Sequence, residues 1–162
     1  MTLRAISRAL SAAAAVLLCA VLAGCSNTPT TPSTTTTPTA STPPTSLVIV
    51  DLIVGTGDPA ASGDAVTTDY TGWLYDATKP DLKGLQFQTS VGSTPLPFTI
   101  GAGQVIEGFD QGVTGMKVGG LRRLIVPASL GYGNQRSGGI PPNTPLIFEI
   151  TLDSVTPPST GS

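Results

Sequence analysis

Apolar and polar positions along the chain predict a succession of β-strands. The first predicted strand is the β-branched run Leu47–Val54, and the second is Val66–Leu74. Within Val66–Leu74 the two sets of alternate positions differ in polarity, with Asp69 on the wetter set. Tyr70 should therefore point into the core and Trp73 outward. The remaining predicted strands are Gln86–Thr89, Leu96–Ile100, Leu121–Val126 and Leu146–Val155.

One helix is predicted among these strands. Val105, Phe109 and Val113 recur at i, i+4 and i+8 with Ile106 beside them, which indicates an amphipathic helix over Val105–Val113. The segment Pro127–Pro145 is rich in Gly, Pro and Asn and predicts a long loop. Several antiparallel strands with one short helix over one face of the sheet define an α+β fold class.

The N-terminal residues 1–24 have the pattern of an export signal. Arg4 and Arg8 precede an apolar run, Ala9–Leu22, which is shorter than the roughly 20 residues that a membrane-spanning helix needs. The run closes on Leu22-Ala23-Gly24-Cys25, which resembles a bacterial lipobox. We therefore expect Cys25 to be lipidated and the protein to be exported, anchored to the outer face of the cell membrane or to the outer membrane. The alternative is an ordinary signal peptide that contains a cysteine.

Residues 25–46 are predicted to form a disordered linker behind the lipidated cysteine. Of the 21 residues Ser26–Ser46, 19 are Ser, Thr or Pro, and none is charged. Such a segment cannot bury enough apolar surface to offset its ordering entropy. The folded domain is then expected over residues 47–157, followed by a short tail over 158–162.

Composition excludes several classes of function. The chain has no histidine, and both cysteines, Cys19 and Cys25, precede the predicted domain, so histidine- and thiol-based catalysis are excluded there. Without the signal, 6 basic residues face 10 acidic ones, which argues against a nucleic-acid partner. No metal, no cofactor and no dimerisation helix is indicated, so we expect a monomer.

Five sequence blocks resemble those of the FKBP-type peptidyl-prolyl cis-trans isomerases. They follow the family's order at nearly its spacing across the whole predicted domain. The blocks are Asp69-Tyr70-Thr71-Gly72-Trp73-Leu74, Val105-Ile106-Glu107-Gly108-Phe109, Gly115-Met116-Lys117-Val118-Gly119-Gly120, Leu130-Gly131-Tyr132-Gly133 and Ile140-Pro141-Pro142-Asn143-Thr144-Pro145-Leu146-Ile147-Phe148.

This resemblance implies a twisted antiparallel sheet wrapped around one short helix, with an aromatic proline pocket between them. The pocket floor would be Phe109, while the Ile106 N–H and the Tyr132 hydroxyl would bind substrate carbonyls. The residues implied in catalysis are Tyr70, Phe87, Gln88, Ile106, Phe109 and Tyr132. Those implied in substrate binding are Phe98, Val105, Ile140 and Phe148. On composition alone, the phenylalanines would be assigned to core packing.

Four departures from the family pattern bear on activity. Gln88 stands where an aspartate is typical, and Phe109 stands where the best-known members have tryptophan. Leu96 replaces a common aromatic, and the loop before Ile140 is one residue shorter. These changes leave an apolar cup but bear on the catalytic rate and on the affinity for macrolide inhibitors.

The implied function is prolyl isomerisation of exported, proline-containing polypeptides by non-covalent stabilisation of a twisted amide. The alternative is a proline-binding or chaperone-like module with weak catalysis, and a third hypothesis is a surface adhesion or assembly component. The charged residues Asp69, Glu107, Arg122 and Arg123 are expected to be surface charges.

Overall fold

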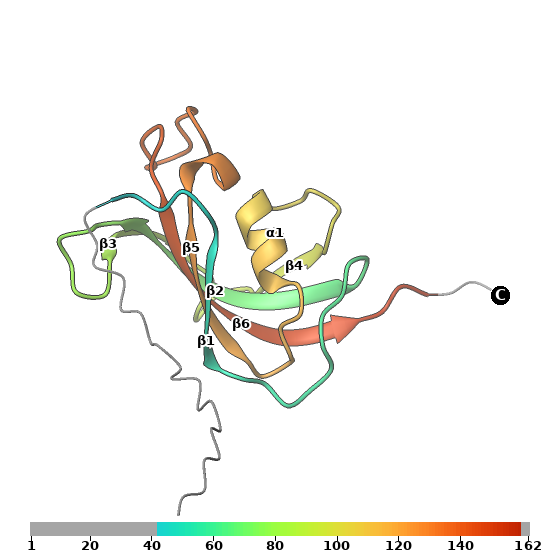
Figure 1. The fold of residues 1–162 in the computed structure, drawn as a ribbon. Helices are drawn as coiled ribbons and strands as arrows, with labels where there is room; N and C mark the ends of the chain where they lie inside the picture. Colours follow the sequence, from blue (N-terminus) through green and yellow to red (C-terminus); the bar gives the residue numbers. More distant parts are fainter. Residues whose placement is uncertain (1–41, 160–162) are drawn as a thin grey trace, which may run out of the picture. The chain divides into compact units, whose positions relative to one another are not determined.

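A computed structural model of the protein describes residues 42–159. The elements are β1 (Val48–Ile53), β2 (Ala65–Tyr75), β3 (Lys83–Thr89), β4 (Leu96–Thr99), α1 (Glu107–Val113), β5 (Leu121–Val126), a 3₁₀ turn η1 (Ala128–Leu130) and β6 (Leu146–Thr156). The sheet is antiparallel in the order β1-β5-β6-β2-β3. β4 pairs with the N-terminal part of β2, on the edge of β2 that β3 borders further along. Its long strands β2 and β6 curve past α1, which covers one face (Figure 1). The predicted α+β fold class is confirmed.

The helix is shorter than the sequence pattern predicts. α1 begins at Glu107 rather than Val105, because Ile106 is extended (φ −62°, ψ 148°) and acts as the N-cap. The apolar pattern begins two residues before the helix, because Val105 and Ile106 also pack against the core without being helical. The strand β5 has the predicted bounds, and β2, β3 and β6 extend beyond theirs.

The hydrophobic core lies between the sheet and α1. In β2 the even positions Val66, Thr68 and Tyr70 are buried, so Tyr70 points inward as predicted. Phe148, Ile150 and Leu152 of β6 and Leu124 of β5 are buried beside them. Burial of a large aliphatic or aromatic side chain contributes about 1.5–3 kcal/mol, which makes this face the main stabilising element.

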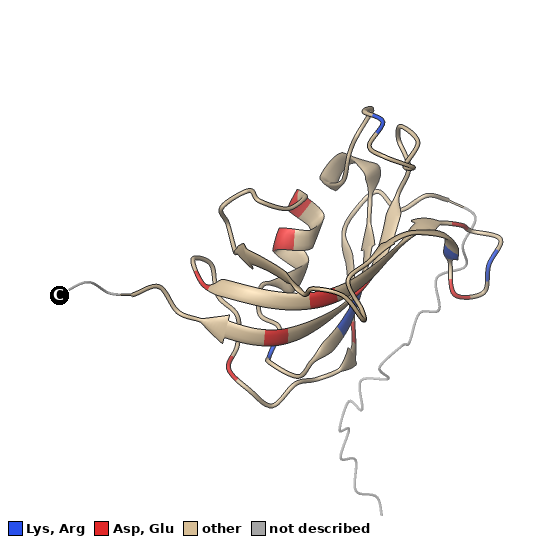
Figure 2. Cartoon of the chain, turned by 180° about the vertical axis from the view of Figure 1, so that it is seen from behind, with Lys and Arg blue, Asp and Glu red and all other residues tan. Residues whose placement is uncertain are grey.

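The opposite face of the sheet carries a small ion-pair network. Glu149 Oε1 lies 2.7 Å from both Lys83 Nζ and Arg123 Nη2. Lys83 also lies 4.2 Å from the centre of the Trp73 ring, so Trp73 is half-buried on the outer face, as predicted. Charges are otherwise few and spread over the molecule, with two acidic residues, Glu107 and Asp110, on the helix (Figure 2).

β1 is an exposed edge strand. Its only strand partner among the described residues is β5. The apolar side chains Val48, Ile49, Val50, Leu52 and Ile53 are each between 38% and 57% exposed. Their hydrophobicity therefore does not mark a buried strand, although it favours the extended backbone.

The N-terminal predictions fall mostly outside the described residues. The signal over residues 1–24, the lipidation of Cys25 and the linker up to residue 41 lie there, as does part of the tail. The last part of the predicted linker, residues 42–46, has bends but no helix or strand. Within residues 42–159 no helix is long and apolar enough to cross a membrane.

Candidate active site

A cavity of about 180 Å³ opens between α1 and the curved sheet. A single water needs only about 10–15 Å³, so this hollow is of ligand size. Its lining residues come from β2, β3, β4 and β6, from α1 and the turn before it, and from the loop after β5. They are Tyr70, Phe87, Gln88, Leu96, Gln104, Val105, Ile106, Phe109, Tyr132 and Phe148.

Four aromatic rings form the cup of the cavity. Phe109 meets Tyr70 at 5.6 Å between ring centroids and Phe148 at 5.4 Å, with interplanar angles of 82° and 88°. Phe87 meets Phe148 in the same way, at 5.8 Å and 89°. Edge-to-face contacts of this kind are favourable and leave ring faces standing as walls. Phe109, 3% exposed, occupies the helix-side base of the cup.

Gly72 makes room for this cup. A Cβ at this position would come within 2.6 Å of Phe87 Cζ and 3.0 Å of Phe148 Cε1. Any side chain would therefore displace one of the two rings. The sequence places Gly72 in a family block, but its spatial role became visible only in the structure.

Tyr70 is held in place through its backbone. Its N–H donates to Ser90 Oγ (2.9 Å), its carbonyl accepts from the Ser90 N–H (2.9 Å), and the Ser90 hydroxyl donates to Asp69 Oδ1 (2.8 Å). Asp69 was expected to be a surface charge, but it is half-buried and accepts a hydrogen bond from Ser90, which in turn holds the backbone of Tyr70. This arrangement fixes the direction of the Tyr70 ring.

The turn before α1 supplies a backbone donor. The Ile106 carbonyl accepts from the N–H groups of Phe109 (3.0 Å) and Asp110 (3.1 Å), which starts the helix. The first N–H groups of a helix have no intrahelical acceptor. Ile106 lines the cavity, and its N–H is a donor that the helix itself does not use.

Tyr132 lies in a hydrogen-bonded loop. The Gly133 N–H donates to the Ala128 carbonyl (2.8 Å), and the Asn143 N–H donates to the Gly133 carbonyl (2.7 Å). Gly133 has a positive φ of 59°, which lets the chain turn directly after the tyrosine. The loop thus presents Tyr132 to the cavity from a constrained backbone.

No acidic or basic side chain lines the cavity among the described residues. Its only ionisable groups are the two tyrosine hydroxyls. Burial, and secondarily the neighbouring Tyr132, raises the pKa of Tyr70 above its ordinary value of 10.0, so its phenol stays neutral at ordinary pH. Gln88 is exposed at the rim and contributes a neutral amide.

The cavity contains eight of the ten residues that the sequence predicted. Phe98 and Ile140 are buried but are not part of the lining. Phe98 packs edge-on against Phe109 (5.7 Å) and so supports the floor from behind. Ile140 belongs to the core cluster.

Gln104 was not predicted, and Leu96 had been noted only as a departure. Gln104 Oε1 accepts the Thr99 N–H (2.7 Å), which ties the turn before α1 to β4. Nothing in the local pattern of the sequence distinguishes this glutamine from a solvated loop residue.

The expectation that Arg122 is a surface charge is wrong. Its residue is only 8% exposed, and its guanidinium is bonded to Asp51 and to backbone carbonyls at the end of α1. Arg123 lies on the outer face of β5 and pairs with Glu149. The two arginines are adjacent, and strand alternation sends them to opposite faces.

The curved antiparallel sheet and the short helix enclose an uncharged aromatic cup, with a backbone donor beside it. Such a pocket suits an apolar ring that is flanked by hydrogen-bonding groups. Residues 57–153, more than half of the chain, match the family model described as "FKBP-type peptidyl-prolyl cis-trans isomerase". The chain belongs to the FKBP-type peptidyl-prolyl cis-trans isomerase family.

Curated relatives agree with this assignment. The chain is 47% identical over 108 residues to an FK506-binding protein of Neisseria meningitidis serogroup A, covering 66% of this chain and 94% of the relative. It is 46% identical over 112 residues to the FK506-binding protein of Streptomyces anulatus, covering 67% and 86%.

Solved structures agree in fold. FkpA from Escherichia coli is similar at a TM-score of 0.58 and 34% identity, over 68% of this chain but only 48% of that one. AtFKBP13 is similar at the same score and identity, over 70% and 96%.

Proposed function

We propose that this protein is an active prolyl isomerase that acts on exported polypeptides. The observation that carries the proposal is the uncharged aromatic cup formed by Tyr70, Phe109 and Phe148, with Ile106 in its lining. A proline ring fits such a cup through apolar contact. The donors at its edge are suited to the carbonyls on either side of the ring.

The chemistry needs no covalent step. Rotation about an X-Pro bond faces a barrier of about 18–20 kcal/mol and takes tens to hundreds of seconds without catalysis. The twisted amide has lost conjugation and is less charge-separated than the planar form. An apolar cup therefore favours it relative to water, and each tenfold acceleration requires only about 1.4 kcal/mol of such preference.

The proposed ligands are proline-containing polypeptides and macrolides of the FK506 type. Two relatives are named for FK506 binding, and they match nearly the whole domain of this chain. The aromatic cup supports both ligand classes, because both would present an apolar ring to it.

We assign the protein to the outside of the cytoplasm, anchored through a lipid on Cys25. The supporting observations are the Arg4 and Arg8 start, the short apolar run and the small residues before Cys25. The Ser/Thr/Pro linker would hold the domain clear of the membrane surface.

A variant tests the anchor. Cys25→Ala should remain an uncleaved precursor and incorporate no labelled fatty acid, whereas Cys19→Ala should be processed and lipidated normally. Lipidation of the Cys25→Ala protein would exclude this anchor.

A second candidate function is a proline-binding or chaperone-like module with weak catalysis. The observation that favours it is the neutral, exposed Gln88 at the position where the family typically has a carboxylate. Loss of one charged hydrogen-bonding group at the rim could reduce the rate without changing the cup.

A protease-free fluorescence assay on an Ala-Leu-Pro-Phe peptide separates the two candidates. The proposal expects clear acceleration of isomerisation at micromolar enzyme, and competition by FK506. Saturable binding of the peptide with a rate no greater than the uncatalysed one would identify a binding module instead.

A further inference from the structure

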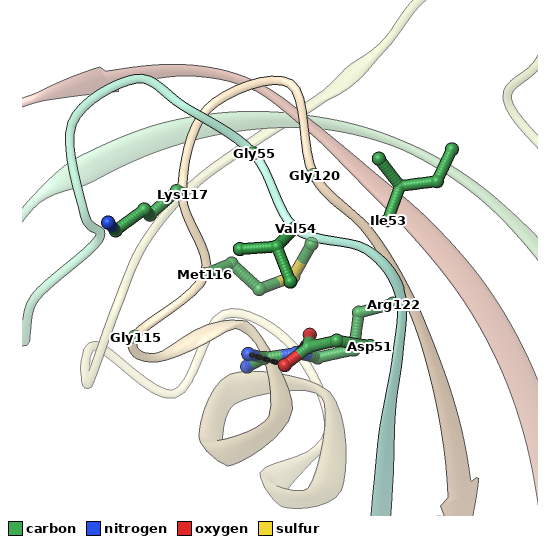
Figure 3. A pocket seen from close by; sticks show the side chains of 9 residues that line it. All are labelled: Asp51, Ile53, Val54, Gly55, Gly115, Met116, Lys117, Gly120 and Arg122. Carbon is green, nitrogen blue, oxygen red and sulfur yellow. Dashed lines mark hydrogen bonds and ion pairs between the residues drawn. The ribbon is translucent and has the colours of Figure 1, made fainter.

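Arg122 joins the end of the pocket helix to the edge of the sheet. Arg122 Nη1 donates to the carbonyls of Gly112 (2.8 Å) and Thr114 (3.2 Å), at the C-terminal end of α1. Its Nε and Nη2 donate to Asp51 Oδ1 (2.6 Å) and Oδ2 (3.2 Å). Figure 3 shows the guanidinium and the Asp51 carboxylate together beside the helix end.

α1 depends on such an external partner. It has only seven residues and no basic residue in its last turn. A helix this short is marginal by itself, and its last carbonyls have no intrahelical donors. The Arg122 guanidinium supplies two donors, and its charge is favourable at the negative end of the helix dipole.

Asp51 fixes the guanidinium from the other side. It lies on β1, directly across from Arg122 on β5 in the strand register. Two parallel N–H···O bonds hold the planar guanidinium in one orientation, which a single charge contact would not do. The Asp51 side chain is 43% exposed and that of Arg122 only 10%, so the carboxylate covers an otherwise buried cation.

The same helix carries the floor of the cavity. Phe109 precedes Gly112 by three residues, less than one helical turn, and Ile106 is the N-cap. A shift at the C-terminal end of so short a helix therefore moves the Phe109 ring and the Ile106 N–H together.

We infer that Asp51 and Arg122 are positioning residues for the isomerase site: they set the place of α1 against the sheet and thereby the geometry of the cup. Neither residue lines the cavity. The inference rests on the proposed function only for its effect on rate, because the predicted shift of Phe109 and Ile106 is independent of catalysis.

The chain offers a matched control on the opposite face of β5. Arg123 and Glu149 form an ion pair of the same type, at 2.7 Å, that does not touch α1. The test variants are Asp51→Asn and Arg122→Lys, and the controls are Glu149→Gln and Arg123→Lys. Lysine keeps the charge of Arg122 but has only three donors on one nitrogen, so it cannot reproduce the four hydrogen bonds of the guanidinium.

The variants should lose about tenfold in kcat/KM, measured well below the thermal midpoint of each protein, because small misplacements of a site are costly. The Ile106 amide and Phe109 ring resonances should shift in both. The controls should lower thermal stability without either effect, and Asp51→Glu should recover part of the rate.

Two results would overturn the inference. In the first, the Ile106 and Phe109 resonances do not change in Asp51→Asn. This result contradicts the positioning role even if the wild-type protein is inactive. The second is an equal loss of rate in Asp51→Asn and Glu149→Gln. An inactive wild type with shifted resonances would remove the proposed function and leave the positioning role supported.

Discussion

At the scale of single residues, the two cavity tyrosines differ in their surroundings. Tyr70 is 8% exposed and held by Ser90, whereas Tyr132 is half-buried in the loop after β5. A hydroxyl at the rim is free to bind substrate without contributing to core packing. A substitution of Tyr132 should therefore weaken substrate recognition without lowering the stability of the fold.

Tyr132→Phe should lower kcat/KM by about 5- to 30-fold, the equivalent of about 1–2 kcal/mol for one lost hydrogen bond in the transition state. The thermal midpoint should remain nearly unchanged. The matched control is Tyr75→Phe, since Tyr75 is a half-buried tyrosine of β2 outside the cavity lining. An intact rate in Tyr132→Phe would show that substrate is bound elsewhere.

In the described part of the chain no acidic or basic side chain lines the cavity, and this predicts how the catalytic rate depends on pH. The wild-type rate should be flat from about pH 5 to pH 9, because no carboxylate, lysine, arginine or histidine side chain among the described residues lines the cavity. Burial raises the pKa of Tyr70 above 10.0, so the stability from its neutral phenol is present below that pH and is lost as pH rises through the raised value.

Gln88→Asp should change that profile. The new carboxylate should raise the rate or the macrolide affinity at neutral pH, and the gain should disappear as pH falls below about 4, the ordinary pKa of aspartate. Gln86→Asp adds the same charge elsewhere on β3 and should leave the rate unchanged. Identical profiles for both variants would mean that Gln88 does not contact the substrate.

At the scale of elements, α1 lies against β5 through glycine. A Cβ at Gly112 would overlap the Leu124 side chain, and one at Gly108 would overlap Val126. The helix can therefore approach the sheet closely only where these side chains are missing. This close approach brings the Gly112 carbonyl within reach of Arg122.

Gly112→Ala should therefore cost stability in spite of the better helix propensity of alanine. Overpacking of this kind typically costs about 1–3 kcal/mol, and the displaced helix should also lower kcat/KM. Urea denaturation with an unchanged m-value would measure the loss. Gln111→Ala, on the exposed side of the same helix, should have nearly the wild-type free energy of unfolding. An equal loss of stability in Gln111→Ala would mean that the effect comes from the helix itself and not from overpacking against Leu124.

The elements also show where sequence reasoning reached its limit. Alternation along β2 correctly placed Tyr70 inside and Trp73 outside, because strand periodicity fixes faces within one strand. It could not place Arg122, since the two faces of β5 look alike until β1 and α1 are docked on them. The β-branched composition of the first segment predicted a strand but not its exposure, which follows from the place of β1 at the sheet edge.

The residues that line the cavity were predictable from the sequence for a different reason, the resemblance to a family. Tyr70, Phe109, Tyr132 and Phe148 lie in ordered family blocks. Eight of the ten predicted residues line one cavity. Phe98 is buried outside the lining and contacts the Phe109 ring edge-on. The spacing along β4 does not distinguish a ring that lines the cavity from one that packs against Phe109 in the core.

At the scale of the whole molecule, the described core is contained in one segment. Every member of the hydrophobic cluster lies between Leu47 and Val155. We therefore expect residues 46–162, produced alone, to fold cooperatively as a monomer and to match the full protein in rate on a short peptide. Sedimentation and denaturant unfolding would test this, and slow amide exchange within residues 26–46 of the longer chain would argue against a disordered linker.

The edge position of β1 has a mechanical consequence. A pulling force on the chain ahead of Val48 is borne first by the bonds between β1 and β5, and by the Asp51–Arg122 contact within that pair. The long pairing of β2 with β6 would bear the force only after β1 has separated from β5. Tension on the chain ahead of β1 would thus release the end of α1 while most of the sheet stays folded, so that it would lower the rate of the enzyme before it unfolds the domain.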